Sequence, residues 1–174
     1  MNDSRNVTDE FKGLSEEDIK QALDKRGVCL EIAVENLTRD FNMGTIVRSA
    51  NAFGVRTVHI IGSKQWNKRG AMMTDKYLNV VYHADIESFI AVMKADDRRV
   101  VCIDNVHGSE PLSMSILSTN DVFVFGAEGP GISSEMLLQS DAIIAIEQLG
   151  STRSVNVGVA AGIAMYEWVR LHVL

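Results

Sequence analysis

The chain has 174 residues, of which 46% are hydrophobic and 23% charged, with a formal net charge of −6. This is the composition of an ordinary globular domain, and the acidic total argues against a surface that binds polyanions everywhere. The first 27 residues lack an apolar signal segment, and no later run approaches membrane-spanning length. We therefore expect one cytoplasmic catalytic or binding domain with no membrane partner.

Residues 1–27 are polar and acidic, and we expect them to form a helical extension in front of a single domain at 28–174. A helix is predicted over Ser15–Lys25, because Ser15 can cap its start and Asp18 completes a pattern similar to a capping box. No repeat or Pro- or Ser-rich linker divides the rest of the chain.

Beyond residue 27, apolar β-branched runs alternate with stretches of helical periodicity. The predicted strands are Val28–Val34, Thr57–Ile61, Leu78–Tyr82, Val100–Ile103, Val122–Phe125 and Ala142–Ile146. The predicted helices are Gly44–Phe53, Ile86–Lys94, Ser133–Leu138 and Ser154–His172. This alternation predicts an α/β fold with a mostly parallel sheet flanked by helices. Cys29 and Cys102 lie in strand-like runs, where we expect reduced, buried thiols.

Residues 36–76 carry seven basic and two acidic side chains, although the whole chain is acidic. Such a basic block can form a local footprint for nucleic acid, and a solvated loop face is the alternative. Within it, the loop Gly62–Asp75 combines basic and apolar residues: Lys64, Trp66, Lys68, Arg69, Met72 and Met73. Cations beside an aromatic ring suit single-stranded RNA, whereas the bland alternative is a surface loop that Trp66 fastens to the body.

A first Gly- and Asn-bearing segment, residues 42–50, follows the first predicted strand. Asn42 can cap the helix that starts here, and Gly54 supplies a left-handed end. Arg48 interrupts an apolar run, so it either faces a cleft or a partner or makes a buried ion pair. Ligands of open α/β sheets bind near the carboxyl ends of the strands, where this segment is expected.

A second segment, Gly126-Ala127-Glu128-Gly129-Pro130-Gly131, follows an apolar strand directly. It matches neither G-x-G-x-x-G nor a P-loop, which argues against a nucleotide phosphate as its ligand. Its position suits a turn that cradles a ligand, with Glu128 as a polar anchor. A plain tight turn is the alternative.

A third segment runs from Gly150 into the last helix. Ser154 and Asn156 are expected near the helix N-terminus, where unpaired N–H groups can hold the polar edge of a ligand, although capping by Ser154 would also explain the pattern. The four histidines show no partner at a recognisable spacing, and no Cys/His cluster indicates zinc. We therefore expect neither a metal site nor a Ser-His-Asp hydrolase.

Taken in order, the three segments resemble the SpoU (TrmH-like) family of the SPOUT RNA methyltransferases, over Val28–Val169. The matching positions are Asn42, Gly44, Arg48, Phe53, Gly54, Gly126, Glu128, Gly131, Ile146, Ser154, Asn156 and Val157. The sequence departs from the family pattern at Glu147-Gln148 in place of Pro-Met, Val155 in place of Leu, and Gly158 in place of Ser. These departures bear on cofactor affinity and on the entry into the last helix.

The resemblance implies a C-terminal trefoil knot, a homodimer, and methylation of the ribose 2′-hydroxyl of RNA by S-adenosylmethionine. It implies tRNA or rRNA as substrate, and the short chain favours tRNA. The implied cofactor-binding residues are Asp104, Asn105, Gly126, Ala127, Glu128, Gly129, Ile146, Gln148, Leu149, Ser154, Val155 and Asn156. The implied catalytic residues are Arg48, Asn42, Glu128, Ser154 and Asn156.

Under this resemblance, Arg48 enters from the partner chain, orients a phosphate and stabilises the developing alkoxide. A guanidinium keeps its proton, so the general base stays open between Arg48 aided by an RNA phosphate, Glu128 and a water. Two other functions remain. One is a non-catalytic RNA-binding or assembly protein that retains the fold, and the other is an α/β protein whose glycine turns bind a different nucleotide.

Overall fold

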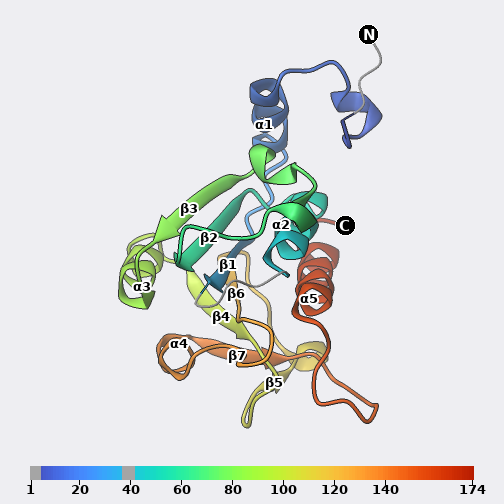
Figure 1. Cartoon of the computed structure of the whole chain (residues 1–174). Coiled ribbons are helices and arrows are strands. Elements are labelled where there is room, and N and C mark those ends of the chain that lie inside the picture. Colours follow the sequence, from blue (N-terminus) through green and yellow to red (C-terminus); the bar gives the residue numbers. More distant parts are fainter. Residues whose placement is uncertain (1–4, 37–41) are drawn as a thin grey trace.

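A computed structural model describes residues 5–36 and 42–174 (Figure 1). The strands are β1 Glu31–Asn36, β2 Thr57–Gly62, β3 Asn79–His83, β4 Arg99–Ile103, β5 Glu110–Pro111, β6 Asp121–Phe125 and β7 Ala142–Ala145. The helices are α1 Glu16–Asp24, α2 Met43–Ala52, α3 Ile86–Ala95, α4 Ser134–Gln139 and α5 Val157–His172. Short 3-10 helices are η1 Asp9–Phe11, η2 Arg69–Ala71, η3 Thr74–Tyr77 and η4 Leu112–Met114.

The strands form one sheet in the order β3-β2-β1-β6-β4-β7-β5, and each neighbouring pair is parallel. The predicted α/β class with a parallel sheet is thereby confirmed. β6 lies between β1 and β4, so the chain returns to the middle of the sheet after it has passed through β4 and β5. The trefoil knot implied by the resemblance stays a prediction.

Two hydrophobic cores lie on opposite faces of the sheet. The larger core joins the sheet to α2 and α5, and Ile46 and Trp168 are among its fully buried side chains. The smaller core joins the other face to α3 and α4 around Phe89 and Met136. Figure 1 shows the resulting three layers, with α2 and α5 on one side of the sheet and α3 and α4 on the other.

The N-terminal extension folds onto the same chain. Ser15 caps α1 by accepting a hydrogen bond from the Asp18 amide at 3.1 Å, which confirms the predicted helix start. Buried side chains of η1 and α1 pack against Tyr77 of η3, forming a small apolar cluster. Asp24 at the end of α1 accepts a hydrogen bond from Arg56 Nε at 2.7 Å, which fixes the extension beside the start of β2.

Two expectations about single residues are corrected, and one short strand was not predicted. Cys29 is exposed, whereas Cys102 is buried and burial raises the pKa of its thiol to about 12. Asn42 stands at the start of α2, but its side chain makes no capping hydrogen bond there. The strand β5 went unpredicted because two residues, one of them Pro111, carry no periodicity. Gly54 does adopt the expected left-handed conformation, with φ of 79°. None of the helices in the described parts of the chain is long and apolar enough to cross a bilayer.

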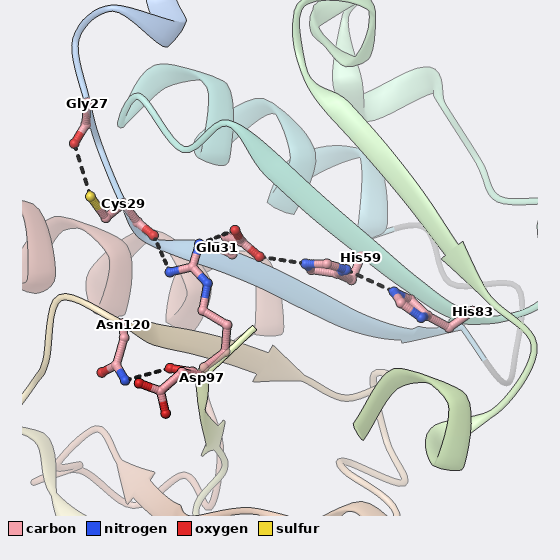
Figure 2. Close-up of polar contacts among 8 residues, drawn as sticks. Gly27, Cys29, Glu31, His59, His83, Asp97 and Asn120 are labelled. Carbon is pink, nitrogen blue, oxygen red and sulfur yellow. Dashed lines mark hydrogen bonds and ion pairs between the residues drawn. The ribbon is translucent and has the colours of Figure 1, made fainter. Parts of the chain in front are cut away.

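A buried polar row crosses three strands on the α3 face of the sheet. Figure 2 shows Glu31 of β1, His59 of β2 and His83 of β3 in line. His59 Nε2 lies 2.8 Å from a Glu31 carboxylate oxygen, and His59 Nδ1 lies 2.9 Å from His83 Nε2. Phe89 packs edge-on against both imidazole rings, and Arg98 pairs with the other oxygen of Glu31.

The electrostatics of this row favour one protonation state. Burial lowers the pKa of His83, and the charge of His59 lowers it further. Burial acts to raise the pKa of Glu31, but the His59 hydrogen bond and the Arg98 charge outweigh it, so the net shift is downward. The folded protein therefore prefers an ionised Glu31 at one end of the row and a neutral His83 at the other.

We expect the folded protein to lose stability as the pH falls below about 6.5, the ordinary histidine pKa. In that range the unfolded chain binds a proton at His83 more readily than the folded chain does, so acid favours unfolding. His83→Gln removes the titration and should flatten the dependence of the unfolding free energy on pH between 7.5 and 5.5. Urea unfolding at several pH values measures it.

His107→Gln is the matched control, because His107 is exposed, and it should keep the wild-type pH dependence. Equal pH profiles for His83→Gln and wild type would show that the row does not titrate as proposed.

Candidate active site

A pocket of about 300 Å³ opens where β4, β6 and β7 end. The carboxyl ends of parallel strands meet at one edge of a sheet, so the loops that follow them converge. The pocket is lined by Ile103, Asp104, Asn105, Gly126, Ala127, Glu128, Gly129, Gly131, Ile146, Gln148, Ser154, Val155, Asn156, Val157 and Ala160. All the predicted cofactor-binding residues except Leu149 are in this lining. Leu149 is fully exposed.

The second glycine segment folds back on itself at the floor of the pocket. Ala127 forms an isolated antiparallel bridge with Gly131, and a Cβ on Gly126 would lie 2.2 Å from the Gly131 carbonyl carbon. Gly129 and Gly131 both have positive φ values, 97° and 73°. Asp104 fastens the turn to the end of β4, because its Oδ2 accepts a hydrogen bond from the Ile132 amide at 2.8 Å. The second segment is therefore a tight turn, as in the alternative interpretation, and it also lines the pocket.

At the rim, the three signature segments meet in one polar cluster. Asn42 Nδ2 donates to Glu128 Oε2 at 2.5 Å, and Asn156 Nδ2 donates to Asn42 Oδ1 at 2.9 Å. Asn156 Nδ2 also lies 3.4 Å from Glu128 Oε1. Residues 86 and 114 positions apart are thereby in direct contact. We call Asn42, Glu128 and Asn156 the rim cluster.

The rim cluster places one carboxylate at the starts of two helices. Asn42 precedes α2, and Asn156 caps α5 by accepting hydrogen bonds from the Gly158 and Val159 amides at 2.9 and 3.4 Å. Helix N-termini carry partial positive charge, so the Glu128 side chain lies where both helices direct their positive ends. Asn156 uses both ends of its amide: Oδ1 accepts from its own helix and Nδ2 donates to Asn42, which an aspartate, an acceptor only, could not do.

The third segment forms an exposed loop that leads into α5. The helix begins at Val157 rather than at the expected Ser154, and Asn156 rather than Ser154 makes the cap, so the alternative explanation, simple capping by Ser154, is wrong. Ser154 is exposed at the pocket wall. Asn105 Nδ2 donates to the Arg153 carbonyl at 3.2 Å, which ties the loop to the end of β4.

Arg48 lies on α2 at an exposed position outside the pocket lining. Within residues 5–36 and 42–174 the structure gives it no hydrogen-bond or ion-pair partner, so a buried ion pair there is excluded. α2 packs against α5, whose first turn borders the pocket, so Arg48 is carried on an element adjoining the site without pointing into it within one chain.

Two departures from the family pattern have local explanations. Glu147 turns away from the pocket and accepts hydrogen bonds from the amide and hydroxyl of Ser113, which lowers its pKa. At position 158, a Cβ would lie 2.9 Å from Thr45 Cγ2 and 3.2 Å from Asn156 Oδ1. The threonine at 45 therefore favours glycine at 158 where α2 and α5 touch.

Sequence reasoning missed four lining residues, Ile103, Gly131, Val157 and Ala160, as pocket residues. Gly131 was already in the second motif, and its positive φ is the signal that marks it as part of the wall. Val157 was likewise in the third motif but was not assigned to the pocket. Ile103 and Ala160 are apolar and carry no chemical signature; only the convergence of strand ends and helix start brings them into the lining.

Comparison with known proteins agrees with this geometry. The SpoU rRNA Methylase family matches residues 29–166. A tRNA (guanosine(18)-2'-O)-methyltransferase of Borreliella burgdorferi is 26% identical over 166 residues, which cover 94% of this chain and 74% of that protein.

Two solved structures are similar in fold. The A. aeolicus TrmH/SpoU tRNA modifying enzyme superposes with a TM-score of 0.77 at 25% identity, over 89% of this chain and 81% of the other. An AdoMet-bound rRNA methyltransferase from Sinorhizobium meliloti gives a TM-score of 0.74 at 25% identity, over 83% and 57%. With the family match spanning most of the chain and the signature residues gathered at one pocket, the protein belongs to the SpoU rRNA methylase family.

Proposed function

We propose that this protein transfers a methyl group from S-adenosylmethionine to a ribose 2′-hydroxyl of RNA. The observation that carries the proposal is the rim cluster, which joins all three signature segments beside a pocket of cofactor size. Relatives that share the fold and the family are named as RNA 2′-O-methyltransferases, and one solved relative contains AdoMet.

The pocket suits S-adenosylmethionine in shape and in chemistry. It has apolar walls at Ile103, Ile146 and Val155, which suit an adenine ring, and carboxylates at Asp104 and Glu128, which suit a sulfonium cation. Gln148 Oε1 is buried with no hydrogen-bond partner within the described chain. A buried acceptor left unpaired costs stability, so a ligand N–H group at this position would satisfy it.

When bound, S-adenosylmethionine supplies an electrophilic methyl group for in-line displacement by the ribose oxygen. The protein must then hold that oxygen in line, accept its proton and stabilise the negative charge that develops on it. We assign Arg48 to the charge, because its guanidinium is permanently cationic and is exposed. Asn42, Ser154 and Asn156 would position the substrate, and Glu128 or a water would take the proton.

A homodimer would bring Arg48 to the pocket. On α5, Val159, Ile163 and Tyr166 are 53%, 41% and 49% exposed, and their spacing puts them on one face of the helix. The Tyr166 ring lies 6.1 Å from the Phe53 ring at the end of α2. We propose that this apolar face joins two copies of the chain, with Arg48 of one copy acting at the pocket of the other.

The substrate we propose is tRNA, with rRNA as the alternative. The similarity extends over 74% of the B. burgdorferi tRNA methyltransferase and over 57% of the S. meliloti rRNA enzyme, so it spans more of the tRNA enzyme. Size-fractionated RNA from a deletion strain of the source organism, labelled by the protein with radioactive S-adenosylmethionine, distinguishes the two. Label that survives as a ribose 2′-O-methyl in small RNA supports tRNA.

Gly126→Ala should weaken S-adenosylmethionine binding by about tenfold or more, because the new Cβ overlaps the backbone at Gly131 and the pocket floor must move. Gly150→Ala is the control, since nothing lies within 4 Å of a Cβ there. Isothermal titration calorimetry measures both. Wild-type affinity in the Gly126→Ala protein would place the cofactor elsewhere.

Arg48→Ala should lower the rate of methyl transfer by about a hundredfold or more while cofactor affinity stays at the wild-type value. Lys94→Ala at the end of α3, on the opposite side of the sheet, is the matched loss of an exposed cation and should change neither. Methyl transfer by Arg48→Ala at the Lys94→Ala rate would remove Arg48 from the mechanism.

If Arg48 acts across a dimer interface, a heterodimer of Arg48→Ala and Gly126→Ala chains should be active. One of its two sites combines an intact pocket with an intact Arg48 from the other chain. Each variant alone should be far less active than the heterodimer when S-adenosylmethionine is kept too dilute to fill the Gly126→Ala pocket. Differentially tagged chains, co-expressed and purified as heterodimers, provide the assay. An inactive heterodimer would mean that Arg48 serves its own pocket.

A further inference from the structure

The loop between β2 and β3 is fastened to the body by its aromatic residue. Asn36 Nδ2 donates to the carbonyls of Ser63 and Gln65 at 2.5 and 3.0 Å, and Trp66 is half-buried against the main core. Lys68 lies over the Trp66 ring, with Nζ 5.3 Å from its centroid, and also pairs with Asp75. These contacts support the alternative in which Trp66 fastens the loop to the body.

The same loop displays two apolar side chains at a strained bend. Met72 and Met73 both adopt left-handed backbone conformations, with φ of 49° and 64°. Such conformations are unfavourable for non-glycine residues and persist where the surroundings or the function require them. Their side chains are 55% and 68% exposed, so burial in this chain does not repay that cost.

The bend belongs to a segment in direct contact with α2, the helix that Asn42 of the rim cluster precedes. η2, which ends at Ala71, packs on the first turn of α2, where a Cβ on Gly44 would lie 2.7 Å from the Ala71 amide nitrogen. Thr45 in that turn meets Gly158 in the first turn of α5. The loop, α2 and the start of α5 with its cap Asn156 are thus linked by successive direct contacts.

Within the described part of residues 42–76, some basic side chains have an acidic partner and others have none. Several basic residues of the segment are neutralised by acidic partners, namely Arg56 by Asp24, Lys68 by Asp75 and Lys76 by Glu16. Lys64 and Arg69 are exposed and have no acidic partner among residues 5–36 and 42–174, and neither has Arg48. In an acidic protein, this leaves positive charge without an acidic partner on the loop that carries the methionines and on the adjoining α2.

We propose that Met72 and Met73 contact an unstacked base of a single-stranded RNA segment, and that Arg69 and Lys64 bind its phosphates. This inference rests on the proposed function and assigns the nucleotide-contacting surface for the same pocket. Apolar side chains such as methionine insert against bases, and arginine and lysine position a nucleic acid through its backbone. The unpaired cations favour a polyanion over an apolar protein partner.

The test measures RNA affinity in variants that keep the backbone conformation. Asparagine tolerates the left-handed region, so Met72→Asn/Met73→Asn should fold with at least wild-type stability. It should weaken binding of a fluorescein-labelled single-stranded RNA 20-mer, measured by anisotropy, about tenfold. Arg69→Gln should reduce the slope of log affinity against log salt by about 0.7, the value for one phosphate contact on single-stranded RNA.

Met114→Asn, at an equally exposed methionine after β5, and Lys94→Gln are the controls and should match wild type. Wild-type RNA affinity in the double methionine variant overturns the proposal. So does a loss of affinity that sedimentation traces to a weaker dimer, because the methionines would then contact a second copy of the chain.

The binding assay also separates the two proposals. If wild type binds RNA without methylating it and the loop variants weaken that binding, the proposed function falls and the loop assignment stands. If wild type methylates RNA and the loop variants keep its affinity and KM, only the loop assignment falls.

Discussion

Close approach of backbones at three glycines is the constraint on which the site depends. A side chain at Gly44 would meet the backbone of η2, one at Gly126 would meet the backbone at Gly131, and one at Gly158 would meet Thr45. Each glycine belongs to a different signature segment, and each lets that segment lie against another. Because main-chain groups and not flexible side-chain ends surround Gly44 and Gly126, neither contact relaxes cheaply.

The rim cluster follows from this close approach. Once α2 and α5 start side by side next to the β6 loop, their terminal asparagines reach the same carboxylate. Glu128 and Asn156 are exposed, so these hydrogen bonds add little net stability. Their effect is on direction: they fix which way the amides and the carboxylate face at the mouth of the pocket. The glycines thus allow the three segments to come together, and the rim cluster orients the side chains at the mouth of the pocket.

Local patterns in the sequence were sufficient to predict the main strands, the flanking helices and the parallel sheet, because each element carries its own periodicity. They could not predict the row Glu31–His59–His83, since its members are 28 and 24 residues apart and meet only through the register of parallel strands. The loop that leads into the last helix shows the same limit. Ser154 and Asn156 are both good caps, and only the tie of the second to Asn42 decides between them.

Trp66 illustrates a different limit, because composition identifies the kinds of residue in a loop but not which of them face solvent. A tryptophan buries more area than a methionine and so takes the anchoring position, and the flexible apolar residues are left outside. The consequence for function lies in α2. Its first turn touches η2 through Gly44, α5 through Thr45 and Glu128 through Asn42. One short helix therefore sets the position of the loop relative to the pocket, and a base held at Met72 and Met73 would keep a fixed relation to the rim that aims the reaction.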